Sequence, residues 1–180
     1  MELANLKDVS VFETAFGEVP GETSKLGGSA SNETLSASSL KYETKVPQLE
    51  YMCLMMENMV LTKKLKGTIY AGFQKQSRAE AIYDRYLAMA EYSEIYLFGE
   101  KDKSLPTHPN IHFVDLPSNA VLTREWFLVI NAPAFKSMMV AYDMDGFGTH
   151  EVEEDRNFKG MKSSSPKTVK AVSEMLASVV

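Results

Sequence analysis

The chain has 180 residues, of which 44% are hydrophobic and 10% are aromatic, and its formal net charge is −5. This length and apolar content suit one globular domain with a buried core. The acidic balance argues against nucleic acid or an anionic membrane as the main partner, because either would select a basic surface. The single cysteine, Cys53, excludes an intrachain disulfide and is expected to be a small buried apolar residue.

The first 46 residues are interpreted as an N-terminal extension and linker. Residues 4–16 could form a short helix, whereas residues 17–41 are rich in Gly, Ser, Thr and Asn, which is typical of a linker. The chain begins without the basic and then apolar pattern of a signal peptide, and no apolar run approaches the roughly 20 residues that span a bilayer. We therefore expect a folded domain over residues 47–180 in a cytoplasmic protein.

The first long element of this domain is a helix that follows Pro47. Proline suits the start of a helix, because its missing N–H falls where a helix leaves donors unpaired. Apolar residues from Leu49 to Val60 recur at helical spacing, and Gly67 is expected to stop the helix. Residues 68–73 then predict a strand.

A second helix and a second strand follow. Ser77 and Glu80 match a capping box, and the apolar spacing after them predicts a helix. Residues 95–98 predict the next strand. A strand, a helix and a strand joined by short links form a βαβ unit, so these two strands are expected to be parallel.

The rest of the chain adds strands and a last helix. Residues 111–116 predict a short strand, and the apolar runs 126–130 and 138–142 predict paired strands buried on both faces. Residues 158–163 predict one more strand, after which Ser165 caps a C-terminal helix. The expected fold class is α+β, with a mixed sheet of about four to six strands, a parallel βαβ unit and flanking helices.

An acidic loop and the three histidines are the candidates for metal binding or catalysis. Residues 143–154 partly follow the calcium-loop pattern, but Phe147 offers no side-chain oxygen at position five, so an acidic exposed turn is favoured. His108, His112 and His150 show no metal-ligand spacing. A nucleophile–His–acid triad can be assembled from residues distant in sequence, but no serine stands in a G-x-S-x-G elbow, so catalysis is the minority interpretation. We therefore predict no metal site and no catalytic residues, and the cofactor stays unknown.

Aromatic residues on the predicted strands and on the second helix would usually fill the core. They could also line an apolar site for a small ligand, with an arginine holding a carboxylate. The candidate ligand-binding residues are Phe73, Arg78, Tyr86, Trp126, Arg156 and Phe158. Methionines of the first long helix are flexible and suit adaptable protein contacts. The candidate partner-binding residues are Met52, Met55, Met56 and Met59.

Three segments carry a resemblance to a known family: Ala71-Gly72-Phe73-Gln74, Arg124-Glu125-Trp126-Phe127 and Arg156-Asn157-Phe158-Lys159-Gly160. Over residues 47–180 the chain resembles the DICT sensory domain, named for its association with diguanylate cyclases and two-component systems. The resemblance implies an α+β sensory module, common in cyanobacteria and other bacteria, with a role in light responses. The family has no established catalytic residues. Met161 and Lys162 depart from it, because a tryptophan often follows this last motif.

The first hypothesis is a non-catalytic cytoplasmic domain that senses a small molecule or a light-linked signal and relays it by protein contact. The alternative is a ligand-free interaction or assembly module, and a third hypothesis is an unrecognised enzyme. The expected partner is another signalling protein or a second copy of the chain, without nucleic acid and without a membrane span.

Overall fold

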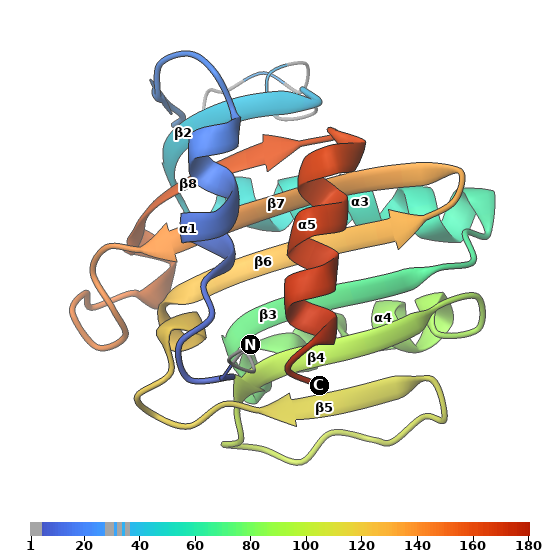
Figure 1. Ribbon diagram of the computed structural model, residues 1–180. Helices are drawn as coiled ribbons and strands as arrows, with labels where there is room; N and C mark the ends of the chain where they lie inside the picture. Colours follow the sequence, from blue (N-terminus) through green and yellow to red (C-terminus); the bar gives the residue numbers. More distant parts are fainter. Residues whose placement is uncertain (1–4, 28–30, 32–33, 35–36) are drawn as a thin grey trace.

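A single mixed sheet of eight strands, in the order β1-β2-β8-β7-β6-β3-β4-β5, forms the centre of the computed structural model (Figure 1). The structure describes residues 5–27, 31, 34 and 37–180. The α+β class and the mixed sheet are confirmed, but the expected number of four to six strands is wrong. The two additional strands are β1 (Ser24–Lys25) and β2 (Ser39–Lys45), which come from the segment interpreted as extension and linker.

The six predicted strands are all present. They are β3 (Thr68–Lys75), β4 (Glu94–Glu100), β5 (Ile111–Asp115), β6 (Glu125–Ala132), β7 (Phe135–Asp143) and β8 (Asn157–Ser163). β3, β4 and β5 are parallel neighbours, so the predicted parallel βαβ pair is confirmed. β6 pairs antiparallel with β3 and β7, and β8 pairs antiparallel with β7 and β2.

Helices cover both faces of the sheet and produce two separate core layers. In Figure 1, α1 (Val11–Ala15) and α5 (Pro166–Ala177) lie in front of the sheet, and α3 (Val46–Lys63) and α4 (Tyr83–Met89) lie behind it. Short 3-10 turns complete the chain: η1 (Phe16–Glu18), η2 (Gln76–Ile82), η3 (Val121–Arg124) and η4 (Glu153–Asp155). None of the helices described is long and apolar enough to cross a bilayer.

The helix starts predicted from capping residues have different outcomes. Ser165 caps α5 as predicted, since its side chain accepts a hydrogen bond from the Thr168 N–H. The predicted capping box at Ser77 is wrong, because η2 runs through this segment and Ser77 Oγ donates to Asp102 Oδ2 at 2.5 Å. The Ser77 hydroxyl, which the local pattern predicts as a helix cap, is therefore bonded to the Asp102 carboxylate in the loop after β4. Helix α3 ends at Lys63, before the predicted stop at Gly67, because Lys64 adopts a left-handed conformation with a φ of 50°.

Glu125, at the start of β6, ties α1 to the sheet. Ser10 Oγ donates to Glu125 Oε2 at 2.6 Å, and the Phe12 N–H donates to Oε1 at 2.8 Å. Ser10 also caps α1 by accepting from the Glu13 N–H. Because Glu125 is 1% exposed, desolvation raises the pKa of its carboxyl from 4.5 to about 7, although both hydrogen bonds oppose this shift.

The raised pKa of Glu125 predicts a stability that falls with pH. A carboxyl whose pKa is higher in the folded state stabilises the fold fully below 4.5, and this contribution is lost as the pH rises through about 7. The loss is about 3 kcal/mol in the free energy of unfolding, measured by urea denaturation from about pH 4.5 to about pH 8. Burial also raises the pKa of Glu57, so the stability of the wild type depends on more than one carboxyl. The difference in free energy of unfolding between the wild type and Glu125→Gln, followed against pH, isolates the contribution of Glu125. Parallel pH curves for both proteins would contradict the assignment.

Candidate functional site

Phe73 on β3 and Trp126 on β6 form an aromatic floor on the sheet face that α3 and α4 cover. The two residues are register partners across the antiparallel pair, so their side chains lie side by side on the same face. Phe73 packs edge-on against Tyr86, with ring centroids 5.6 Å apart, and Trp126 packs edge-on against Phe158 at 6.0 Å. All four predicted aromatic ligand residues therefore belong to one layer.

Two adjoining hollows lie on this floor, between α3 and the η2–α4 segment. Their volumes are about 250 Å³ and about 340 Å³. Glu50, Phe73, Ile82 and Trp126 line both of them, and we call the combined depression the aromatic groove. A concave apolar surface with a few polar groups at its rim is the usual form of a small-molecule site.

The charges of the aromatic groove are divided between its walls. Arg78 lines the smaller hollow and lies 3.6 Å from Glu154, and Arg85 lines the larger one and donates to the buried Glu57 at 2.8 Å. Glu50 stands on the α3 wall, where burial raises the pKa of its carboxyl and Arg78 opposes the shift. The arrangement can hold a flat apolar molecule with an anionic group near Arg78.

The indole N–H of Trp126 is buried, and no oxygen or nitrogen acceptor of the described residues bonds to it. Its neighbour in the larger hollow is the Cys53 thiol, which is only a weak acceptor. Burial raises the pKa of this thiol well above its usual range, so Cys53 is the small buried apolar residue that was predicted. Packing, rather than a strong hydrogen bond, therefore holds the tryptophan ring in the groove.

A buried polar network adjoins the smaller hollow. Arg156 is 1% exposed and donates from Nη1 to Asp143 Oδ2 at 2.6 Å and to Gln74 Oε1 at 3.1 Å. Gln74 donates in turn to Asp143 Oδ2 at 3.0 Å and to the Thr123 carbonyl at 3.1 Å. The guanidinium predicted to hold a ligand carboxylate thus has an internal carboxylate already, which leaves Arg78 as the more accessible cation of the groove.

Gln74 and Asp143 belong to this site but were not predicted. Gln74 has a φ of 68°, which is unusual for a residue with a side chain, and it lies where the register of β3 against β4 shifts. The irregular backbone turns its side chain into the network. No local pattern in the sequence signals this conformation, because the partners of Gln74 come from segments far away in the sequence.

The structure brings most of the predicted ligand residues together. Phe73, Arg78, Trp126 and Arg156 line the smaller hollow, and Tyr86 lies behind Phe73. Phe158 lies behind Trp126 and lines a different depression at the edge of the sheet.

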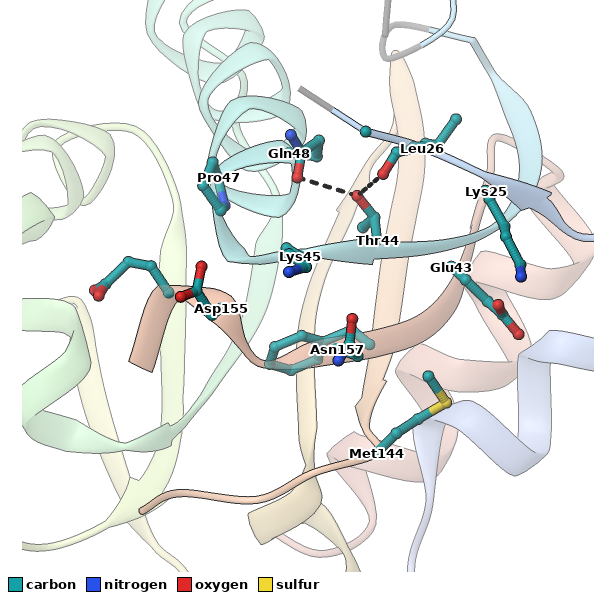
Figure 2. Close-up of a pocket in the computed structure, with 13 residues that line it drawn as sticks. Lys25, Leu26, Glu43, Thr44, Lys45, Pro47, Gln48, Met144, Asp155 and Asn157 are labelled. Carbon is teal, nitrogen blue, oxygen red and sulfur yellow. Dashed lines mark hydrogen bonds between the residues drawn. The ribbon is translucent and has the colours of Figure 1, made fainter. Parts of the chain in front are cut away.

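Figure 2 shows that edge depression, which has a volume of about 530 Å³ and lies between β1, β2, the start of α3 and the segment before β8. Lys25 and Lys45 face it together with Glu43 and Asp155, so its charge is mixed. The Thr44 hydroxyl at its centre already bonds to the Leu26 carbonyl at 2.9 Å and to Gln48 at 3.2 Å. We therefore place the candidate site in the aromatic groove.

The methionines of α3 divide between the core and the surface. Met52, a residue of α3, is fully buried, so its prediction as a partner contact is corrected: it is a core residue. Met55 and Met59 are half-buried, and together with the buried Met56 they line a separate apolar depression of about 370 Å³, which we call the methionine hollow.

The histidines are dispersed, and each is near a different carboxylate. His108 lies 3.4 Å from Glu91 and His112 lies 2.6 Å from Glu94. In the described part of the chain, no three His, Cys, Asp or Glu residues are grouped so as to hold a metal ion.

The acidic segment after β7 is the connection to β8, as the turn interpretation predicts. Asp143, at its start, pairs with Arg156. Asp145 Oδ2 accepts the Asn157 N–H at 2.8 Å and lies 2.7 Å from His150. The carboxylates of Asp143 and Asp145 therefore stabilise the connection between β7 and β8.

The sheet, its two helical layers and the groove describe an α+β domain with a concave site floored by aromatic residues. The model of the DICT family, described as the sensory domain in diguanylate cyclases and two-component system, matches residues 29–144, and the chain belongs to this family. The match begins before the expected limit at residue 47 and ends before β8. It includes Phe73, Arg78 and Trp126, whereas the Arg156–Gly160 motif lies beyond it.

No curated protein matches the chain significantly. Two solved structures are similar at low identity. A polyphosphate kinase from Porphyromonas gingivalis has a TM-score of 0.46 and 13% identity over 78% of this chain, which corresponds to only 23% of the kinase chain. NucT from Helicobacter pylori has a TM-score of 0.42 and 11% identity over 79% of this chain and 98% of its own.

Proposed function

We propose that this DICT domain is a non-catalytic, cytoplasmic sensory module that holds a small molecule in the aromatic groove and relays its presence by protein contact. The observation that carries the proposal is the floor of Phe73 and Trp126, shared by both hollows, with Arg78 and Arg85 on the wall beside it. Stacking on the aromatic rings would bind the body of the ligand, and Arg78 would select an anionic group.

Helix α3 connects the groove with a surface that a partner could contact. Glu50 and Leu54 line the groove on one flank of α3, and Met55 and Met59 line the methionine hollow on the other. A ligand that shifts α3 would therefore alter the methionine surface as well. Thioether side chains suit an adaptable contact, and the partner would be a signalling output protein or a second copy of the chain.

The second candidate function is a ligand-free interaction module, which the half-exposed Met55 and Met59 favour. Native mass spectrometry of the protein purified from its own host separates the two. A bound small molecule supports the sensory proposal, and visible absorbance of that molecule would support a light-linked signal. One stoichiometric protein partner without a ligand supports the interaction module, and a ligand recovered in a chemically altered form would indicate an enzyme.

Trp126 is the only tryptophan of the chain, so its emission reports on the groove directly. Titration with anilinonaphthalene sulfonate, an aromatic probe with an anionic group, is expected to quench this emission saturably. Arg78→Gln should weaken the binding of the probe about tenfold, because it removes the cation at the rim.

Lys103→Gln is the matched control for this titration. Lys103 is a similarly exposed cation that pairs with Glu80 at 2.5 Å and does not line either hollow of the groove. Its loss is expected to leave the affinity for the probe unchanged. Equal affinities for the wild type and Arg78→Gln, or quenching that does not saturate, would place the probe elsewhere and overturn the assignment of the groove.

A further inference from the structure

The open charges of the aromatic groove have opposite signs and stand on opposite walls. Glu50 of α3 lines both hollows, and Arg78 of η2 lines the smaller one. Within the described part of the chain, no hydrogen bond or salt bridge holds the Glu50 carboxylate. Burial raises the pKa of this carboxyl, and Arg78 is near enough to oppose the rise. The two side chains therefore face the same space without closing it, which leaves room for a ligand group between them.

A second carboxylate stands at the same end of the groove. Glu154 of η4 lines the smaller hollow, lies 3.6 Å from Arg78 and adds to the rise in the pKa of Glu50. Arg156 lines this hollow as well, but its charge is paired with Asp143. The charged groups open to a ligand at this end are therefore one guanidinium and two carboxylates.

This set of charges selects against a ligand that carries only an anion. Such a ligand would gain a contact with Arg78 but would also place its own negative charge beside Glu50 and Glu154. A cationic group next to the anion removes this repulsion and adds an attraction to both carboxylates. Arg85 is less suited to hold the anion, because its Nε already donates to the buried Glu57 at 2.8 Å.

We propose that the ligand of the aromatic groove is an aromatic amino acid, a zwitterion whose ammonium and carboxylate are separated by one carbon atom. The carboxylate lies beside Arg78, the ammonium lies beside Glu50, and the ring lies on the floor of Phe73 and Trp126 that both hollows share. The inference rests on the proposed function, since it names the ligand class of the same groove. The short distance between the two charges of an amino acid suits two side chains that face each other without a salt bridge.

Calorimetric titration of the full chain at neutral pH with three indoles tests the proposal. L-Tryptophan carries both charges, indole-3-propionate lacks the ammonium and tryptamine lacks the carboxylate. Tryptophan is expected to bind with one-to-one stoichiometry, and each analogue should bind at least about tenfold more weakly. Glu50→Gln should make tryptophan bind no better than indole-3-propionate. Arg78→Gln should make it bind no better than tryptamine, so each variant removes the preference for one group alone.

Glu80→Gln and Lys103→Gln are the matched controls for the two charges. Glu80 and Lys103 pair with each other at 2.5 Å, and neither lines a hollow of the groove, so both variants should bind tryptophan as the wild type does. All four replaced side chains are at least partly exposed. The circular dichroism melting curves of the four variants should therefore stay close to that of the wild type.

The proposal is overturned if tryptophan does not bind, if indole-3-propionate or tryptamine binds equally well, or if Glu50→Gln keeps the preference for the ammonium. Titration with anilinonaphthalene sulfonate separates this failure from a failure of the proposed function. If the probe still quenches Trp126 in an Arg78-dependent way, the groove remains the ligand site and only the ligand class is wrong. If neither the probe nor the indoles bind, both proposals fail.

Discussion

Replacing Arg156 by methionine is expected to lower the free energy of unfolding by about 3–5 kcal/mol, because it leaves a buried carboxylate without its cation. Asp143 is fully buried, and its Oδ2 lies 2.6 Å from Arg156 Nη1. Gln74 loses the same donor. Urea denaturation at about pH 7 measures the loss, and the midpoint should fall without a change in the slope of the transition.

Two comparison variants separate the buried charge from a general effect of losing an arginine. Arg78→Met removes a partly exposed arginine whose pair with Glu154 spans 3.6 Å, so it should cost less than about 1 kcal/mol. The double variant Arg156→Met with Asp143→Asn removes both charges and keeps the Asp143 Oδ1 position that accepts the Gly146 N–H. It should recover part of the lost stability. A double variant as unstable as Arg156→Met, or a single variant as mild as Arg78→Met, would contradict this account.

The same network explains how an unfavourable backbone conformation persists beside the groove. A residue with a side chain at a φ of 68° costs about 1–3 kcal/mol, and such residues concentrate at functional sites. Gln74 is held there by Asp143, Arg156 and the Thr123 carbonyl. Because Gln74 and Arg156 also line the smaller hollow, the network fixes one end of the aromatic groove in place.

Local patterns were sufficient for the elements whose own residues determine them. The apolar runs of β6 and β7 and the Ser165 cap of α5 are readable because burial on both faces and capping chemistry depend on neighbouring residues. β2 was missed because its sequence, SLKYETK, is mostly polar, and only Tyr42 is fully buried. Its strand conformation comes from pairing with β8, which no local pattern reveals.

The candidate site was predictable in its residue types but not in its geometry. Aromatic residues and arginines could be selected from the sequence, yet the groove exists because the register of β3 on β6 places Phe73 beside Trp126. The pairing of Arg156 with Asp143 was equally hidden, because it depends on the path of the β7–β8 connection. Met52 shows the same limit, because helical spacing gives no rule that separates the buried Met52 from the half-buried Met59.

Gly160→Ala is the second change with a large expected effect, about 3 kcal/mol or more in the free energy of unfolding. A Cβ at Gly160 would lie 2.2 Å from the Val140 carbonyl oxygen and 2.9 Å from Tyr42 Cε2. β8 runs between β2 and β7, so the strand cannot move away from one neighbour without approaching the other. Gly17→Ala is the matched control, because a Cβ there meets nothing within 4 Å, and it should change stability by less than about 0.5 kcal/mol.

A new methyl group would meet backbone atoms at Gly160 but side-chain atoms at Gly72, so the two substitutions should respond differently to a second mutation. At Gly72 the obstruction is the Phe127 ring, at 2.2 Å, so a smaller side chain in Phe127→Leu should relieve part of the cost of Gly72→Ala. At Gly160 the nearest obstruction is the backbone of β7, so Tyr42→Leu should give no comparable relief. A double-mutant cycle measures both couplings. Relief at Gly160 equal to that at Gly72 would mean that the Tyr42 ring, and not the close approach of two strands, requires a glycine in the Arg156–Gly160 motif.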